Sequence, residues 1–312
     1  MKKRSLITKL ALSGVALAAT AATLATSTYA WYTSNTTVTA NNVSGAAADT
    51  GDSSIFVSTD AKNWSQSVDL TFDEKNTAAV MDAANGSNFA SAKLIPVQSV
   101  GGVLKSKDGK ANAGTNDVLT FYLYFKTAKT SDNVNLYFNS IAVKNKDSKL
   151  TEVDNLLNGS SKDNVGVDTS KSSYAVDIVK ALGMYTTTTT TKYSTIGNAS
   201  GSVEEVKNKL DLQKNATAFD DINVKNADAL AYYNAVMGGT ALTKGEDVDT
   251  LTDASFTVGD THTKVAVLDK DGGVCAVRFD VFLNGWDEYC YDACKGQSFT
   301  ITLGFTSNNK NN

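Results

Sequence analysis

The chain has 312 residues and a formal net charge of -4 at pH 7, and it loses four basic residues and no acidic one if residues 1–30 are removed, which leaves -8. Beyond residue 30 its lysines are scattered and Arg278 is the only arginine. A chain of this kind has no basic stripe that follows phosphates, so nucleic acid is not an expected partner. The remaining residues, about 280, are enough for one large β domain.

The N-terminal segment has the parts of a secretory signal peptide in the expected order. Three basic residues at positions 2–4 precede an apolar run from Leu10 to Leu24, and a stretch of small residues follows. Polar and small residues interrupt the run, which is therefore weaker than the roughly 20 apolar residues of a stable membrane span. We predict a secreted protein that is cleaved between Ala30 and Trp31. Retention of residues 1–30 as an anchor is the alternative, and it would be the only contact with a membrane.

Residues 31–52 are interpreted as a leading strand and a linker, and residues 53–305 as an all-β sandwich domain. Ser54–Ser58 and Ser67–Phe72 flank a turn-rich segment, which predicts a hairpin. The clearest strand is Val118–Phe125, whose two faces are both apolar, and we expect it to be central. The spacing from Tyr174 to Met184 fits a helix and a strand equally well.

Residues 145–260 are interpreted as an insertion that contains helices. Ser202 and Glu205 are spaced as in a capping box, which predicts a helix over Val203–Leu212. A second helix is predicted from Ala227 to Met237, because Asn226 precedes it and two glycines follow it.

The C-terminal third returns to strands. Lys264–Leu268 and Val274–Leu283 flank the turn Asp269–Gly273, whose Asp-Gly step predicts a second hairpin. Ser298–Phe305 alternates apolar and polar residues as a closing strand, and residues 306–312 are expected to form a disordered tail.

Three cysteines, Cys275, Cys290 and Cys294, lie in this third of the chain. In an oxidising compartment, an odd number suggests one disulfide and one thiol, or a bridge between chains. Cys290 and Cys294 are four residues apart, so they can be joined in a turn or helix but not along one strand. Buried thiols are the alternative.

No residue pattern predicts catalysis, a cofactor or a metal. His262 is the only histidine, so a metalloprotease motif with two histidines is excluded, and we interpret His262 as an exposed turn residue. Asp269 and Asp271 fit a hairpin turn better than a calcium loop. The aromatic residues of the loop after residue 284, which are Trp286, Tyr289 and Tyr291, form either a ligand platform or packing for the loop.

The segment Thr28–Thr33 (TYAWYT), where the apolar run meets a Thr- and Val-rich strand, resembles the secreted TasA and camelysin proteins of Gram-positive bacteria. Precursors in that family are processed by a SipW-type signal peptidase. The segments 58–64 (STDAKNW), 94–97 (LIPV) and 283–287 (LNGWD) also resemble parts of related surface proteins, whereas residues 145–260 carry no resemblance. The family implies a jelly-roll sandwich and, for its TasA-like members, extracellular fibres. The metalloprotease activity attributed to camelysins is not carried over, because this chain has no recognisable set of zinc ligands.

The resemblance makes the segment that follows the predicted cleavage point a candidate donor strand. Cleavage would release an extended segment that can add to a sheet edge of the next subunit, which is itself another copy or a related matrix subunit. The candidate residues are Trp31, Tyr32, Thr36, Val38, Ala40 and Val43. We therefore expect a structural protein of the cell surface or matrix, with a monomeric module that binds a glycan or host ligand through the Trp286 loop as the alternative.

Overall fold

Strands make up most of the described chain, and its one named helical element is a short 3-10 turn at Ile178–Ala181. The computed structural model describes residues 38–47, 55–71, 93–106, 111–114, 117–128, 132–145, 149–152, 173–188, 191–195, 198–202, 204–213, 216–217, 249–256, 262–270, 272–285, 287, 289–290 and 297–307. Within these residues no helix is long and apolar enough to cross a membrane. The predicted signal peptide and its cleavage point lie outside them.

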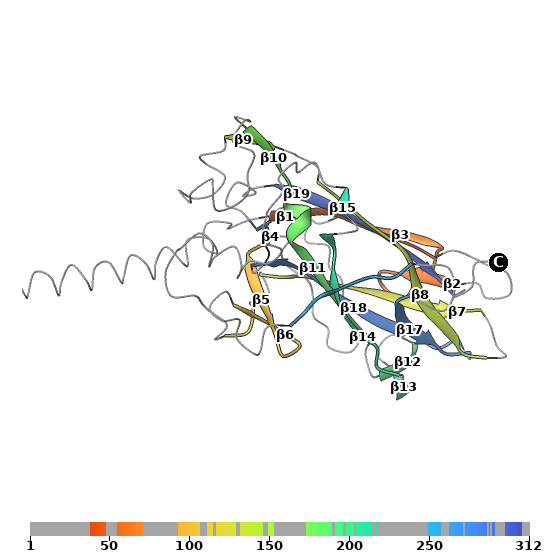
Figure 1. Cartoon of the computed structure of the whole chain (residues 1–312). Coiled ribbons are helices and arrows are strands. Elements are labelled where there is room, and N and C mark those ends of the chain that lie inside the picture. The colour runs from red at the N-terminus through yellow and green to blue at the C-terminus, as the bar shows by residue number, and fades with distance from the viewer. Residues whose placement is uncertain are drawn as a thin grey trace, which may run out of the picture.

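The strands form two sheets that pack face to face (Figure 1). The first sheet has the order β17 (Lys264–Leu268), β8 (Val134–Asn145), β19 (Ser298–Thr306), β1 (Val38–Ala47) and β3 (Ser67–Thr71). β4 (Lys93–Leu94) also pairs with β1, and β15 (Ala216–Thr217) pairs with β8.

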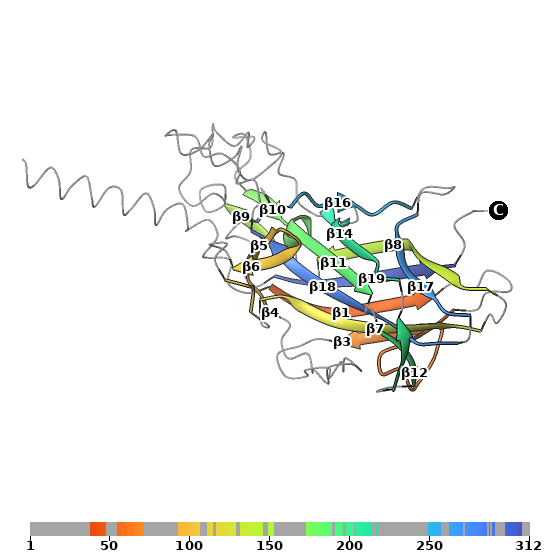
Figure 2. The same ribbon diagram turned by 90° about the horizontal axis from the view of Figure 1, so that it is seen from below.

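The second sheet is seen from below in Figure 2, where β11, β18 and β7 lie side by side. Its order is β14 (Lys207–Asp211), β11 (Leu182–Thr188), β18 (Cys275–Asn284), β7 (Leu119–Thr127) and β2 (Ile55–Ser58). The hairpin of β5 (Pro96–Val100) and β6 (Val103–Ser106) continues from the end of β18, and β16 (Thr252–Asp253) lies beside β14. Two small ribbons complete the described strands, β9 (Lys149–Glu152) with β10 (Ser173–Val176) and β12 (Thr191–Thr195) with β13 (Asn198–Ser202).

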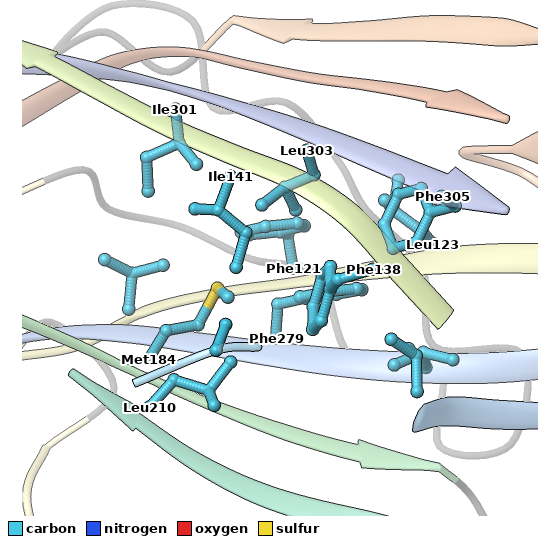
Figure 3. Packing of buried hydrophobic residues seen from close by; sticks show 14 of the residues in the cluster. Phe121, Leu123, Phe138, Ile141, Met184, Leu210, Phe279, Ile301, Leu303 and Phe305 are labelled. Atoms are coloured by element: carbon cyan, nitrogen blue, oxygen red, sulfur yellow. The ribbon is translucent and has the colours of Figure 1, made fainter. Parts of the chain in front are cut away.

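Aliphatic and aromatic side chains fill the space between the two sheets (Figure 3). Phe121 of β7 stacks on Phe279 of β18 with ring centroids 5.0 Å apart, and Phe125 meets Phe305 of β19 edge-on at 4.9 Å. All four rings are fully buried. The period of two along each strand directs these residues to one face, and the predicted all-β sandwich is confirmed.

Both predicted hairpins are wrong, because each pair of strands is divided between the two sheets. β2 pairs with β7 in the second sheet, whereas β3 pairs with β1 in the first. β17 likewise pairs with β8, and β18 pairs with β11 and β7. The turn residues reverse the chain as expected, but the chain also crosses to the other layer. Repeated crossings of this kind are typical of jelly-roll-like sandwiches.

The predicted helix over Val203–Leu212 is also wrong, since Lys207–Asp211 is the strand β14. Leu210 pairs with Met184 of β11, and both side chains are buried. Lys207 and Lys209 alternate along the strand with the face that carries Leu210, as a period of two requires. Pairing with a neighbouring strand therefore overrides the local capping pattern that predicted a helix. The second predicted helix, residues 227–237, lies outside the described residues. Within the interval 145–260, β11 and β14 are integral strands of the second sheet.

Candidate functional site

The first candidate site is the position of β1 inside the first sheet. β1 runs parallel to β19, from the pair Thr39 and Ser298 to the pair Ala47 and Phe305, with an irregularity between Ala40 and Asn42. Its other edge pairs with β3 and β4. β1 therefore separates β3 from β19, and both of its edges are hydrogen-bonded to other strands.

The sequence of β1, Val-Thr-Ala-Asn-Asn-Val-Ser-Gly-Ala-Ala, contains no large apolar residue. Val38 and Val43 are its largest apolar residues, and the backbone ladder contributes along both edges of the strand. Of the candidate donor residues, Val38, Ala40 and Val43 lie in β1, whereas Trp31, Tyr32 and Thr36 lie outside the described residues. The strand continues beyond Val43, the last of the candidate residues, as far as Ala47.

A buried polar network fixes the place where β19 begins beside β1. Gln297 directly precedes β19, and its Oε1 accepts hydrogen bonds from Asn145 Nδ2 and from the backbone N–H of Ile178, both at 2.9 Å. Asn145 Nδ2 also donates to Asp177 Oδ1 at 2.9 Å. Asp177 and Gln297 are fully buried. Buried amides and carboxylates require such partners, so the network sets the start of the strand against which β1 pairs.

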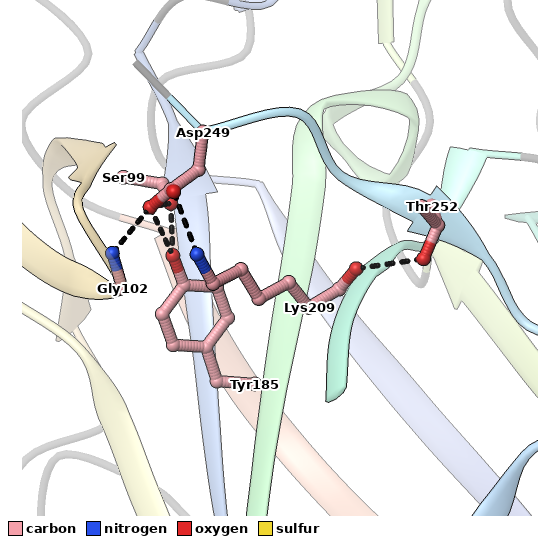
Figure 4. A network of polar contacts seen from close by, with 6 residues as sticks. All are labelled: Ser99, Gly102, Tyr185, Lys209, Asp249 and Thr252. Carbon is pink, nitrogen blue, oxygen red and sulfur yellow. Dashed lines mark hydrogen bonds and ion pairs between the residues drawn. The ribbon is translucent and has the colours of Figure 1, made fainter. Parts of the chain in front are cut away.

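The second candidate site is a cluster of polar groups around the carboxylate of Asp249, on the outer side of the second sheet (Figure 4). Lys209 Nζ of β14 lies 2.6 Å from Oδ1. Oδ2 accepts hydrogen bonds from Ser99 Oγ at 2.7 Å, from the backbone N–H of Gly102 at 2.8 Å and from the Tyr185 hydroxyl at 3.2 Å. Ser99 Oγ and the Tyr185 hydroxyl also contact each other.

The charges in the Asp249 cluster favour a structural role over nucleophilic chemistry. Burial acts to raise the pKa of Asp249, but the hydrogen bonds from Lys209, Ser99 and Gly102 outweigh it and lower the pKa from 3.8 to about 2. Burial, with the charge of Asp249 nearby, raises the pKa of Tyr185 to about 12. Asp249 is thus ionised and Tyr185 protonated at neutral pH, and a carboxylate this acidic is a weak base for the Ser99 hydroxyl.

The lowered pKa of Asp249 predicts a dependence of stability on acid. Because the carboxylate is more acidic in the folded than in the unfolded chain, its contribution is present above about pH 4 and is lost as the pH falls towards 2. We expect Asp249→Asn to melt at a lower temperature than the wild type at pH 5, and the gap to narrow as the pH falls from 4 to 2. Melting curves of both proteins across this range test this, and a gap that stays constant would contradict it. Asp60, whose pKa also lies at about 2, is present in both proteins, so its contribution cancels in the difference between their melting temperatures.

The loop aromatics are only partly described, because Trp286 and Tyr291 lie outside the described residues. Tyr289 packs against the main core, and Lys180 Nζ lies 4.3 Å from the centroid of its ring. These contacts give Tyr289 a packing role, which is one of the two roles predicted for the aromatic residues of this loop.

Cys275 carries a free thiol, fully buried in β18, and burial raises its pKa to about 12. A disulfide from Cys275 to either of the other cysteines is therefore not formed. Cys290 is buried, and Cys294 lies outside the described residues, so a bridge between those two stays a prediction.

His262 is buried rather than exposed, which corrects the sequence-based expectation. It directly precedes the short link to β17, and its ring meets Tyr137 of β8 edge-on at 6.4 Å between centroids. Among the described residues, no group of three or more His, Cys, Asp or Glu side chains is placed to hold a metal ion.

The fold defines the chain as an all-β sandwich protein in which β1, the first of the described strands, is integrated into one sheet. Comparison with models of protein families, with curated proteins and with solved structures finds no match.

Proposed function

We propose that the chain is a secreted, non-catalytic structural protein of the cell surface or extracellular matrix, and that its subunits join by exchanging β1. The position of β1 carries this proposal. β1 pairs along both of its edges within its own subunit. A second copy that supplies the same strand would form the same hydrogen bonds, so β1 can connect two subunits.

The composition of β1 makes such an exchange thermodynamically mild. Apart from Val38 and Val43 the strand contains small or polar residues, so it exposes less apolar surface while it moves between subunits than a strand rich in large apolar residues would. The contacts in the exchanged state are those of the closed state, so exchange costs mainly the entropy of association, a cost that higher subunit concentration offsets.

The exchange of an N-terminal strand produces a head-to-tail contact. Each subunit gives β1 to one neighbour and receives β1 from another between its own β19 and β3. Contacts of this heterologous kind form open filaments unless the rotation between subunits closes a ring. A fibre subunit is therefore the form of structural protein that this geometry favours.

The proposal is tested by the N-terminal sequence and the size of the protein secreted by its native host, compared with a variant that lacks residues 31–47. We expect a mature chain that starts at Trp31 and forms large assemblies, which electron microscopy shows as filaments and which the deletion abolishes. A synthetic peptide of residues 31–47 is expected to bind the deleted protein and to restore its melting temperature. Folded monomers from both chains at all concentrations would overturn the proposal and turn attention to ligands of the Trp286 loop.

A further inference from the structure

Residues 249–253, here called the strap, cross the outer side of the second sheet from β5 to β14 (Figure 4). At one end the N–H of Asp249 donates to the carbonyl of Ser99 in β5 at 2.8 Å. At the other end Thr252 pairs in parallel with Leu210 of β14, and its hydroxyl donates to the carbonyl of Lys209 at 3.2 Å. Between these ends the strap passes over β11, which contributes Tyr185 to the Asp249 cluster.

The strap covers a small apolar cluster that is distinct from the core of the sandwich. Its buried members are Val97, Val118, Tyr185 and Phe282, and the partly buried residues Leu104, Ala113 and Leu251 pack on them. Gly183 makes room for this layer, because a Cβ atom there would lie 2.4 Å from the ring of Phe282 and 3.0 Å from a methyl group of Leu251. The second sheet thus has a thin third layer on its outer side.

One side chain of the strap bonds to three separate elements of the second sheet. Thr250, Thr252 and Asp253 are exposed, and Leu251 is only partly buried. Asp249, by contrast, receives four hydrogen bonds from three separate elements, the β5–β6 hairpin, β11 and β14. Bonds to a charged acceptor are stronger than neutral ones, so the carboxylate is a strong attachment point of the strap.

We propose that the strap is a cover that opens locally while the sandwich stays folded, and that the carboxylate of Asp249 is the latch that keeps it closed. Segments with few buried apolar contacts open at lower free energy than core strands. The main core between the two sheets does not include any residue of the strap. The proposed opening of the strap involves the second sheet and does not depend on the exchange of β1, which belongs to the first sheet.

Hydrogen exchange measured by mass spectrometry on the full chain tests the latch. In Asp249→Asn we expect exchange to become about 10- to 100-fold faster at residues 250–253 and at residues 99–104, because the loss of charged hydrogen bonds makes local opening more frequent. Exchange in β18 and β19 is expected to stay at the wild-type rate.

Two lysines of β14 provide a matched pair of milder variants. Lys209→Met removes the ion pair of the latch and is expected to speed exchange in the strap several-fold. Lys207→Met, two residues away, removes only an exposed pair with Glu205 and is expected to change nothing in the strap.

Three results would overturn the proposal. Unchanged exchange in the strap of Asp249→Asn would show that the carboxylate does not hold it. Equal acceleration in β18 and β19 would show that the strap opens only with the whole fold. Equal effects of Lys207→Met and Lys209→Met would assign the change to net charge instead of the latch.

Discussion

Phe305→Ala is expected to lower the free energy of unfolding by about 3–5 kcal/mol, the range for removing a large buried aromatic side chain. Phe305 is fully buried in β19, and its ring meets those of Phe125, Phe138 and Phe279 at centroid distances of 4.9, 5.4 and 6.3 Å. The cavity left by alanine would lie between the two sheets, because Phe125 and Phe279 belong to the second sheet. Urea denaturation gives the free energy directly.

Two control substitutions accompany Phe305→Ala. Phe305→Leu keeps most of the volume and is expected to cost less than about 1.5 kcal/mol. Val103→Ala truncates a side chain that is 43% exposed and is expected to change stability by no more than about 0.5 kcal/mol. If Phe305→Ala is as stable as Phe305→Leu, the packing of the two sheets on this ring is contradicted.

Val43→Pro is expected to lower the free energy of unfolding by about 2–4 kcal/mol, because proline removes a backbone donor from the ladder and leaves an acceptor without its hydrogen bond. Proline is tolerated in sheets at edges and bulges, but β1 pairs on both sides at Val43, with Ile301 and with Leu70. Urea denaturation of the mature chain measures the loss.

Val43→Thr is the matched control, since threonine is also β-branched and keeps the backbone N–H. We expect it to cost less than half as much as Val43→Pro. Proline at this position should also reduce assembly, because the same ladder is needed whether β1 pairs within its own subunit or with a neighbour. A Val43→Pro protein with unchanged stability would place β1 outside the sheet.

The strands were the most predictable part of this fold. Val118–Phe125 was expected from apolar residues on both of its faces and Ser298–Phe305 from its alternation of apolar and polar residues, and both are strands of the sandwich as β7 and β19. Alternation depends only on the local sequence, so it indicates a strand whichever sheet the strand joins.

The assignment of strands to sheets was not predictable in the same way. The segment around Asp60 is a well-formed turn, in which its carboxylate accepts hydrogen bonds from the N–H groups of Lys62 and Asn63, both at 2.8 Å. This local chemistry reverses the chain but does not decide which sheet the next strand joins. That choice depends on the partners of β3, which lie in β1, and explains why a hairpin was predicted and an inter-sheet connection is found.

The Asp249 cluster had no signal in the sequence. Ser99 and Asp249 are 150 residues apart in the chain, Gly102 and Asp249 are 147 apart, and Tyr185 and Asp249 are 64 apart. Each residue by itself is an ordinary polar residue in a β protein. Only the pairing of β5, β11 and β14 within one sheet brings them together.

The exchange of β1 is tested most directly by a disulfide between β1 and β3. Ser44 lies directly opposite Asp69 in antiparallel pairing, and opposite residues have Cα atoms about 4.5–5.5 Å apart, within the range of a disulfide. The variant with Ser44→Cys and Asp69→Cys is assembled, oxidised and run on a non-reducing denaturing gel beside the two variants that carry only one of these substitutions. Exchange predicts a ladder of covalently linked chains from the assembled protein and cross-linked monomers from the dilute protein. Cross-linked monomers alone, recovered from intact assemblies, would contradict it.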